Sequence, residues 1–328
     1  MRFGNRCFPI LDKIGIIRRQ GVFIRKVIII DFKDLQKEDK PVLDAFFHSR
    51  YYENSHFNFT NFYMWRKPFH IMWTVEDEVL YMKAVWKDRA FAMQPFGPEE
   101  KLDTAIGRLL DWFRETEQPV FFSGIERSFA ERLKRYQGAS FEIQEDRDNY
   151  DYVYSSQDLI TLAGRKFHSK KNHLNSFRKN YAEAEYQPIT EEIVTQCKLN
   201  INGWYKQRAQ ENPDDPFIAA EREAILEVLN NFADFGLKGG AIFVGKRVVA
   251  FTFGEQLNTD TAVIHVEKAD PEVRGAYPAI NQAFVEHAWS DMTYINREED
   301  MGIEGLRKAK ESYKPVKMIE KFNAVLKK

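Results

Sequence analysis

A short polar segment near the C-terminus holds the residues best suited to bind an anion. An apolar run, 292–295, leads into a loop with Asn296, Arg297 and Asp300, and the helix expected next must end by Pro315, because proline cannot continue it. If Asp300 caps that helix, the free N–H groups of its first turn point into the loop. The segment therefore predicts an anion site at a helix start, with a solvated surface helix as the alternative.

The same segment supplies glycines and cations at helical spacing. Gly302 and Gly305 open the expected turn, and Arg307, Lys310 and Lys314 follow on one face of the helix. Helix N–H groups and cations together bind phosphate or carboxylate oxygens, although ordinary surface ion pairs would give the same pattern. We therefore predict that five residues bind substrate: Arg297, Gly302, Gly305, Arg307 and Lys310.

Carboxylates at the ends of expected strands are candidate proton carriers. Glu267 ends one such strand, and Glu298, Glu299 and Asp300 follow another. Acyl transfer to an amine needs a base to take a proton and dipoles aimed at the developing oxyanion, so strand-end carboxylates suit it. The amide of Asn296 can orient a substrate. For each of these side chains, a structural role is the alternative. The predicted catalytic residues are Glu267, Asn296 and Asp300.

A second group of cations lies in segment 164–181, which contains no acidic residue. Phe167, Leu174, Phe177 and Tyr181 form an apolar stripe at helical spacing, so the cations, including Lys170, Lys171 and Arg178, are expected to point outward. A cationic face of one sign suits the phosphates of a tRNA backbone or a nucleotide cofactor, and a solvated helix face is the alternative. The predicted phosphate-binding residues are Arg165, Lys166, Lys170, Lys171, Arg178 and Lys179.

Composition describes a globular chain with an unusual start. The 328 residues are 44% hydrophobic and 14% aromatic, which is enough for two domains with their own cores. The net charge is −1, yet residues 1–27 carry seven Lys or Arg against one acidic residue. No small-residue cleavage site follows this basic leader, so we expect a disordered or non-native extension rather than a signal peptide.

Several function classes are excluded by what the sequence lacks. No apolar run approaches the roughly 18 residues of a membrane span, and two cysteines give no disulfide framework, which fits the cytoplasm. His168 and His173 are the only histidines near metal-ligand spacing, and they lie among lysines, so no metal site is predicted. The chain has neither a Gly-x-Ser-x-Gly elbow nor a P-loop, which argues against a serine hydrolase or an NTPase.

The elements that must position these residues recur in one order in both halves of the chain. Periodicity in the first half predicts helices and turns over 31–66, strands 70–75, 79–85 and 90–93, helix 99–115, strand 120–122, helix 127–136 and a strand pair through 141–154. The second half predicts helices 191–210 and 217–235, strands 241–244, 248–254 and 261–267, helix 278–289, strand 292–295, the basic helix and a closing strand 318–325. We therefore predict a duplication, with a structural unit 28–155 and an active-site unit 156–328, and with the aromatic residues around Trp65 as core between them.

This order resembles the GNAT acyltransferase fold present twice. Segments 162–181, 239–254 and 296–307 are similar to the DUF2156 proteins, which are grouped with the C-terminal domain of phosphatidylglycerol lysyltransferase. The resemblance covers the chain from about residue 28 to its C-terminus. It implies an α/β (α+β) fold of two tandem GNAT-like domains, each with a mostly antiparallel mixed sheet flanked by helices.

The resemblance also implies an activity. The lysyltransferases move an aminoacyl group from aminoacyl-tRNA onto a membrane lipid, and Fem-type aminoacyltransferases use a similar tandem fold on cell-wall precursors. This chain lacks the multi-helix membrane domain of the lysyltransferases. The resemblance therefore predicts tRNA as a partner and leaves the acceptor open among small molecules, lipids and peptides.

A coenzyme A-dependent N-acetyltransferase is the second hypothesis, and a non-catalytic binding protein is the third. In GNAT enzymes a glycine-rich turn before the long helix binds the pyrophosphate of coenzyme A at the helix start. The matching turn here offers Arg274 and Gly275 as phosphate-binding residues, but Tyr277 is bulky and Pro278 removes one N–H donor. The first copy, at 95–98, has no arginine and a single glycine, so one active site is expected.

Overall fold

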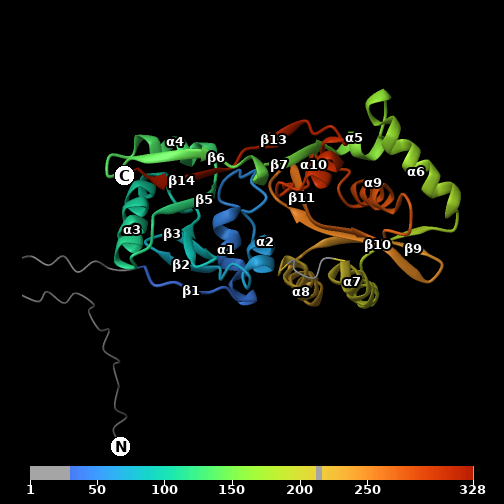
Figure 1. Ribbon diagram of the computed structural model, residues 1–328, viewed down its shortest axis with the longest axis horizontal. Helices are drawn as coiled ribbons and strands as arrows, with labels where there is room; N and C mark the ends of the chain where they lie inside the picture. The colour runs from blue at the N-terminus through green and yellow to red at the C-terminus, as the bar shows by residue number, and fades with distance from the viewer. Residues whose placement is uncertain (1–29, 212–215, 328) are drawn as a thin grey trace, which may run out of the picture.

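The computed structural model describes residues 30–211 and 216–327, which leaves the predicted basic leader, 1–27, outside the described residues. Two sheets of seven strands each lie side by side along the long axis of the molecule (Figure 1). Most strand neighbours are antiparallel, and the parallel pairs are β4 with β5 and β11 with β12. The expectation of an α/β (α+β) fold with two mostly antiparallel mixed sheets flanked by helices is confirmed.

The first sheet has the strand order β1-β2-β3-β4-β5-β14-β6. These strands are β1 Lys33–Asp34, β2 Met72–Glu76, β3 Val79–Trp86, β4 Arg89–Ala92, β5 Phe121–Ile125, β14 Phe322–Leu326 and β6 Phe141–Glu145. Its helices are α1 Lys40–Phe47, α2 Phe59–Trp65, α3 Leu102–Glu115 and α4 Arg127–Arg135, with short 3-10 turns at Lys37–Asp39, Glu99–Lys101 and Arg147–Asn149. Helix α3 forms because Leu102, Ile106, Leu109 and Phe113 recur on one face, which is buried on the sheet.

The second sheet has the strand order β13-β7-β12-β11-β10-β9-β8. These strands are β13 Lys317–Ile319, β7 Asp151–Ser155, β12 Tyr294–Asn296, β11 Thr261–Ala269, β10 Arg247–Gln256, β9 Lys238–Val244 and β8 Glu185–Pro188. Its helices are α5 Ser156–Thr161, α6 His168–Asn180, α7 Glu191–Glu211, α8 Pro216–Asn230, α9 Ala276–Ala288 and α10 Glu304–Glu311, with a 3-10 turn at Arg165–Phe167. Helices α7 and α8 cover one face of this sheet, and α6, α9 and α10 lie on the other (Figure 1).

The two sheets exchange strands across the predicted division of the chain. Strand β7 lies in the second sheet between β13 and β12, whereas the last strand, β14, lies in the first sheet between β5 and β6. The predicted pair 141–154 and the predicted closing strand 318–325 each split into two strands that belong to different sheets. A division at residue 155 therefore does not separate the sheets.

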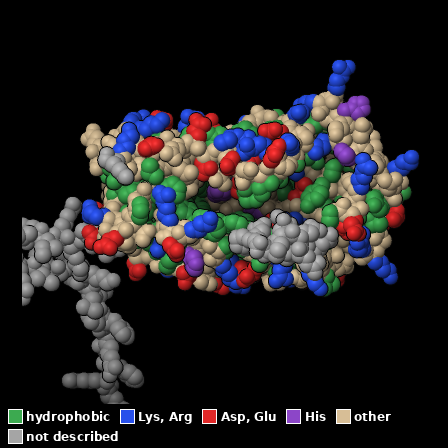
Figure 2. All heavy atoms as spheres, viewed as in Figure 1, with side chains coloured by type: hydrophobic (Ala, Val, Ile, Leu, Met, Phe, Trp, Pro, Cys, Tyr) green, Lys and Arg blue, Asp and Glu red, His purple; other side chains and the backbone are tan. Residues whose placement is uncertain are grey.

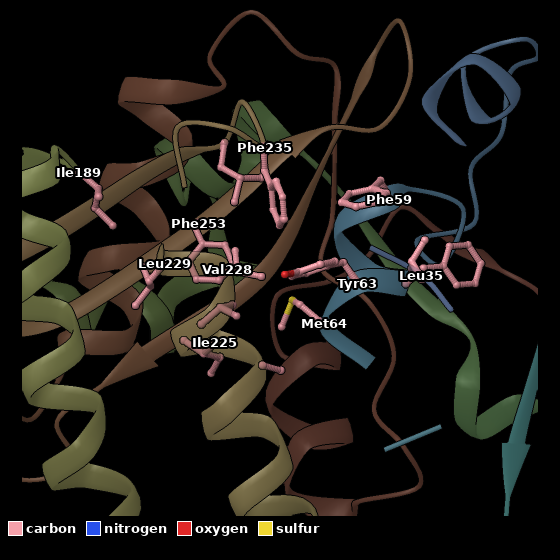
Figure 3. Close-up of a cluster of buried hydrophobic side chains, with 14 of the residues drawn as sticks. Leu35, Phe59, Tyr63, Met64, Ile189, Ile225, Val228, Leu229, Phe235 and Phe253 are labelled. Atoms are coloured by element: carbon pink, nitrogen blue, oxygen red, sulfur yellow. The ribbon is translucent and has the colours of Figure 1, made fainter. Parts of the chain in front are cut away.

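One hydrophobic core joins the two units. Helix α2 of the first unit packs on α8 of the second, and the ring of Phe235 lies 5.3 Å from Phe59 and 4.9 Å from Tyr63, centre to centre (Figure 3). Both contacts are edge-to-face, the arrangement that aromatic rings prefer. The prediction that the aromatic residues around Trp65 form core between the units is confirmed, with Trp65 itself partly buried against this core. None of the described helices combines the length and the apolar character that a membrane crossing requires.

Candidate functional site

The parallel strands β11 and β12 separate after three paired residues. Thr261, Ala262 and Val263 pair with Tyr294–Asn296, but β11 continues to Ala269 while the chain after β12 turns away into a loop. The separation opens the second sheet between the end of β11 and residues 297–300.

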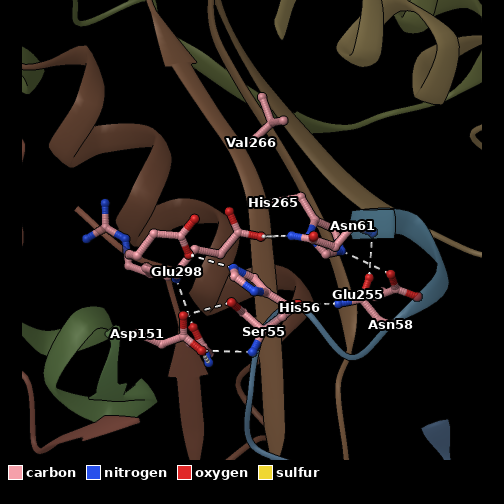
Figure 4. A network of polar contacts seen from close by, with 12 residues as sticks. Ser55, His56, Asn58, Asn61, Asp151, Glu255, His265, Val266 and Glu298 are labelled. Carbon is pink, nitrogen blue, oxygen red and sulfur yellow. Dashed lines mark hydrogen bonds and ion pairs between the residues drawn. The ribbon is translucent and has the colours of Figure 1, made fainter. Parts of the chain in front are cut away.

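His265 occupies a β-bulge at this opening. Phe253 of β10 pairs with Val266 and Gly254 pairs with Ile264, which leaves His265 without a partner on β10. A bulge changes the direction of the side chain at the extra residue, and here His265 points toward α2 of the first unit (Figure 4). Gly254 makes the close approach possible, because a Cβ at this position would lie 2.0 Å from the carbonyl oxygen of Val263.

The imidazole of His265 lies between two carboxylates. Its Nδ1 is 3.0 Å from Glu298 Oε1 and its Nε2 is 3.0 Å from Glu255 Oε1, so the carboxylates bind opposite sides of the ring (Figure 4). The His265 side chain is 1% exposed. Burial disfavours the charged ring, but the two carboxylates outweigh burial and raise the pKa of His265 to about 9. With both carboxylates ionised, this triad carries one net negative charge at neutral pH.

A second charged network lies beside the triad and joins both units. Lys321, which precedes β14, and Asp151 of β7 are both fully buried, with 2.6 Å between Lys321 Nζ and Asp151 Oδ1. Lys321 Nζ also lies 3.4 Å from Glu299 Oε2, and His56 Nε2 lies 3.4 Å from the same oxygen. Burial alone would raise the pKa of Glu299, but Lys321 and His56 hold it well below its ordinary value. Ser55 closes the network by donating its N–H and its hydroxyl to Asp151 (Figure 4).

The surface between the two units is hollowed. Figure 2 shows this hollow in the middle of one face, with histidine, acidic and hydrophobic side chains around it. Glu298, 19% exposed, and His56, 27% exposed, are the more accessible members of the two networks. The two carboxylates of the triad bind opposite ring nitrogens and do not converge on one point, and the described residues contain no group of metal-ligand type.

Asp300, a predicted catalytic residue, is fully buried and accepts hydrogen bonds from Tyr152, Arg147 and Arg307. Burial would raise its pKa, but the bonds from Arg307, Tyr152 and the N–H of Gly302 outweigh burial and lower the pKa to about 2. The prediction that Asp300 caps the basic helix is wrong: α10 begins at Glu304, and its N-cap, Ile303, offers no side-chain acceptor. Tyr152 of β7 and Arg307 of α10 donate to the Asp300 carboxylate, which therefore does not cap the start of α10.

Three further predicted residues bind the chain itself. Asn296 is fully buried, donates to the carbonyl of Glu53 and to Asp151, and accepts the N–H of Glu298. Lys310 donates to the carbonyls of Arg297 and Glu298, and burial together with the charge of Arg297 lowers its pKa to about 8. Arg307 binds Asp300 and also Asp148, at 2.7 Å. The polar groups of these three side chains, which are predicted to bind a substrate, therefore bind other residues of the protein.

The two predicted glycines, Gly302 and Gly305, lie in different surroundings. Gly302 has a φ of 72°, and a Cβ there would lie 2.9 Å from an Asp148 oxygen. Gly305 lies in the exposed first turn of α10, with open space around its Cα. At the expected anion site Arg307 and Lys310 are therefore bound within the protein, whereas Lys314 lies beyond the end of α10 and is exposed.

Glu267 and Arg297 face the opposite side of the sheet opening, toward α9. Arg297 Nη2 donates to Glu267 Oε1 at 2.9 Å, and Asn281 Nδ2 donates to Glu267 Oε2 at 3.0 Å. The guanidinium lies 5.5 Å from the ring centre of Tyr154 and 4.7 Å from that of Tyr313. The opening thus has an acidic triad on the face toward the first unit and an arginine between tyrosines on the other.

The predicted basic segment forms α6, with one cation turned inward. The apolar stripe packs on α9 as expected, and Arg165, Lys171 and Lys179 are exposed. Lys166 pairs with Asp158 at 2.7 Å, and Arg178 donates to Gln282 at 2.9 Å. The prediction that Lys170 points outward is wrong, because Lys170 lies three residues after Phe167 and so on the same face as the stripe. Its Nζ lies 4.2 Å from the ring centre of Tyr313.

The start of α9 does not offer an open site for a pyrophosphate. Gly275 is its N-cap with a φ of 88°, but a Cβ at Gly275 would lie 2.7 Å from the carbonyl of His173 and 2.9 Å from Cβ of Phe177. Helix α6 therefore covers the turn, and the neighbouring Arg274 is exposed. The residues present do not fit coenzyme A in the position that the ordinary GNAT arrangement would give it.

The sequence model of the phosphatidylglycerol lysyltransferase C-terminal family matches residues 49–325. The chain belongs to this family. The match spans both units and the junction between them, which is where the charged networks lie. The family is named after a lysyltransferase.

Solved structures agree with this membership. A conserved protein of unknown function from Bacteroides thetaiotaomicron is 35% identical, covers 91% of this chain and 100% of its own, and has a TM-score of 0.84. The C-terminal DUF2156 domain of a putative lysylphosphatidylglycerol synthetase from Agrobacterium fabrum is 11% identical, covers 88% and 91% of the two chains, and has a TM-score of 0.63. L-PGS from Bacillus licheniformis is 14% identical over 78% and 83%, with a TM-score of 0.57. The last two share the fold.

One curated relative also matches in sequence, and its name states no function. An uncharacterized protein of Mycoplasmoides gallisepticum is 26% identical over 176 residues, which are 52% of this chain. The match spans about half of that relative, 54% of its length.

Sequence reasoning missed six residues of the two networks: Ser55, His56, Asp151, Glu255, His265 and Lys321. Glu255 and His265 each lie next to apolar residues of an expected strand, with Phe253 and Gly254 before the first and Ile264 and Val266 around the second. Burying an ionisable side chain without a partner costs free energy, so an ionisable residue within an apolar run indicates a buried polar contact. This pattern could have identified Glu255 and His265. His56 and Lys321 carried no comparable signal, because their burial depends on contacts between the units.

Proposed function

We propose that the protein is an aminoacyltransferase that moves an aminoacyl group from aminoacyl-tRNA to an acceptor at the junction of the two units. The observation that carries this proposal is the family match over residues 49–325. It covers the whole junction in which the triad of Glu255, His265 and Glu298 faces the first unit. The names of the Agrobacterium and Bacillus relatives refer to lysylphosphatidylglycerol synthesis and support the reaction class.

The triad supplies two functions in this proposal. Its net negative charge favours the ammonium group of an aminoacyl ester over a neutral acyl group. The acceptor oxygen or nitrogen attacks the ester carbonyl and passes its proton to the Glu298 carboxylate, which returns that proton to the ribose oxygen of the tRNA as the ester bond breaks. His265 does not act as the base, because its raised pKa keeps the ring protonated at neutral pH. It holds both carboxylates in place by donating an N–H to each.

Glu267 is the second proposed proton acceptor, on the α9 face of the opening. Its carboxylate is 13% exposed and already accepts from Arg297 and Asn281, so both oxygens are hydrogen-bonded. Glu298 is favoured because its side chain is 19% exposed, against 13% for Glu267, and because it faces the first unit, where Asn61 of α2 donates to it.

Helix α6 is the proposed contact for the tRNA backbone. Arg165, Lys171 and Lys179 are exposed on α6 or the turn before it and have no acidic partner among residues 30–211 and 216–327. Binding of tRNA should weaken steeply with salt, because each phosphate contact releases a counterion. Replacing the three cations by alanine should weaken binding and reduce the salt slope by about one per lost contact.

The test of the donor is a binding measurement with two ligands. Purified protein is expected to bind aminoacyl-tRNA with a salt-dependent affinity, and acetyl-CoA is expected to leave its melting temperature unchanged. Salt-independent tRNA binding would remove the aminoacyl-tRNA hypothesis. A rise in melting temperature with acetyl-CoA alone would support the N-acetyltransferase, and a response to neither ligand would favour a non-catalytic binding protein.

A further inference from the structure

Helix α7 exposes an apolar side chain on its outer face. Leu199 lies near the middle of the helix and is 69% exposed, more than any other large hydrophobic side chain among residues 30–211 and 216–327. The opposite face of the helix is buried in the core that joins the two units, through Ile193, Cys197 and Ile201. A single exposed leucine is ordinary, so the residues that share its face must show whether it has a partner.

The residues one heptad to either side of Leu199 carry opposite charges. Glu192 precedes Leu199 by seven residues and Lys206 follows it by seven, so the three side chains lie along one line of the helix. Both charged side chains are exposed, and neither has an ion-pair partner in the part of the chain that the structure describes. The line spans about 21 Å, because each helical residue adds about 1.5 Å. Helix α7 therefore presents an acidic, an apolar and a basic side chain to solvent at equal intervals.

A groove lies beside the acidic end of this line. It has a volume of about 590 Å³, is open to solvent, and lies between α7, strands β8 and β9 and the turn after β9. Ile193 and Phe243 form its buried apolar part. Its exposed polar residues include Glu192, Gln196 and Lys246. A groove of this kind can take the aliphatic stem of a lysine whose ammonium group reaches a carboxylate at the rim.

The charged line is complementary to itself under a twofold rotation. When two copies pack α7 against α7 in antiparallel directions, with the axis at Leu199, the two leucines meet and each Glu192 faces the partner's Lys206. Antiparallel packing also brings the opposite ends of the two helix dipoles together. Opposite charges at equal distances from one apolar residue favour a second copy over a different protein, which would not need this symmetry.

We propose that a second copy of the chain docks on α7 and forms a twofold dimer with Leu199 on its axis. The partner's Lys206 places its stem in the groove beside α7 and its ammonium group against Glu192, and the same contact repeats at the other end of the helix pair. One helix pair makes a small interface, below about 1,200 Å², so we expect dimers at micromolar protein concentrations and above. The dimer does not depend on the proposed aminoacyl transfer.

Sedimentation velocity of the full chain over a range of concentrations tests the centre of the contact. Wild type is expected to pass from monomer to dimer, and Leu199→Glu is expected to weaken association about 10-fold or more, because two carboxylates would then meet on the axis. Val42→Glu is the matched control. Val42 of α1 is also an exposed apolar helix residue, 45% exposed, and its replacement should leave association unchanged. Equal melting temperatures of the two variants would show that both are folded.

Charge reversal tests whether the partner is a second copy in the antiparallel arrangement. Glu192→Lys alone and Lys206→Glu alone should each weaken dimerisation, because like charges then meet at both ends of the helix pair. An equal mixture of these two variants should associate as wild type does, since both ends of the mixed dimer again join a lysine to a glutamate. The double variant, which carries both changes, should also regain the dimer.

Three results would overturn this dimer. Wild type that stays monomeric at every concentration would leave the outer face of α7 to another protein or to solvent. A dimer that Leu199→Glu and Val42→Glu affect equally would use a different surface. A mixture of Glu192→Lys and Lys206→Glu that associates no better than either variant alone would exclude the antiparallel pairing of the two charges.

Discussion

Glu298, Glu299 and Asp300 are consecutive, yet their carboxylates bind three different sets of groups. Glu298 binds His265, Glu299 binds Lys321 and His56, and Asp300 binds the arginines of α10 and the Arg147–Asn149 turn. Glu298 has a φ of 57°, a left-handed conformation that changes the direction of the chain at this point. One loop thereby supplies the proposed base, a link between the units and the anchor of α10.

The triad predicts how stability depends on pH. The pKa of His265 is raised from 6.5 to about 9, so its contribution is fully present below pH 6.5 and is lost as the pH rises through 9. From pH 6.5 to 8 the unfolded chain loses this proton while the folded chain keeps it. The free energy of unfolding should therefore fall by about 1 kcal/mol per pH unit more in wild type than in His265→Gln.

Urea unfolding of both proteins at several pH values measures this difference. Comparing two proteins cancels the groups they share, including Glu126, whose pKa burial raises to about 7. Identical slopes for wild type and His265→Gln would mean that the ring is not protonated in the folded state.

Asp300 should act on stability through its buried charge. Asp300→Ala leaves the guanidinium of Arg307 and its neighbour Arg147 without their shared buried acceptor, and it should cost roughly 3 kcal/mol of unfolding free energy. Asp148 also binds Arg307 but is 61% exposed, so Asp148→Ala should cost less than about 1 kcal/mol. Urea denaturation compares the two. A cost for Asp300→Ala as small as that for Asp148→Ala would contradict the anchoring role of Asp300.

At the scale of elements, the bulge in β11 is what turns His265 toward the first unit. Gly254→Ala would place a Cβ 2.0 Å from the Val263 carbonyl, so the bulge must shift or open. We expect a loss of about 2–3 kcal/mol in unfolding free energy together with a lower pKa of His265. Gly203→Ala is the control, because this helical glycine of α7 has open space around it and should gain about 0.5–1 kcal/mol. An NMR titration of the His265 ring reads the pKa, and an unchanged value in Gly254→Ala would contradict the role given to the bulge.

Most elements could be predicted from periodicity, but the direction of single charged side chains could not. The stripe of Phe167, Leu174 and Phe177 identified α6 and its buried face, and the same spacing places Lys170 on that face. The charge of Lys170 favours an outward direction, whereas its position in the helical repeat places it on the buried face, and the position decides. The role of Asp300 could not be predicted for a related reason: a cap needs only local contacts, whereas two of its partners, Tyr152 and Arg147, lie 148 and 153 residues away in sequence.

At the scale of the whole molecule, the exchange of β7 and β14 ties the two sheets together. No local sequence pattern predicts such an exchange. Strands β6, β7, β13 and β14 each have an ordinary strand pattern, and long-range pairing determines their partners. The buried pair of Lys321 and Asp151 lies between the exchanged strands. We expect both units to unfold in one transition, since neither sheet is complete without a strand from the other part of the chain.

Lys321→Met tests this coupling. Loss of the ammonium leaves Asp151 buried without its cation, and it should cost roughly 3–5 kcal/mol of unfolding free energy. Lys327 is exposed just after β14, and Lys327→Met should change stability by no more than about 0.5 kcal/mol. Circular dichroism and tryptophan fluorescence should give coincident unfolding curves for wild type. Two separate transitions, with only one of them moved by Lys321→Met, would contradict a single cooperative unit.

Aminoacyl transfer is proposed to take place on the face of the second sheet that carries Glu298. Its most direct test is the rate at which labelled aminoacyl groups pass from tRNA to a lipid and small-molecule extract, measured for wild type, Glu298→Gln and Glu267→Gln at equal folded concentration. We expect transfer by wild type, a loss of about 100-fold or more in Glu298→Gln, and a smaller loss in Glu267→Gln. Full activity in Glu298→Gln, with activity abolished in Glu267→Gln, would contradict it and move the chemistry to the α9 face.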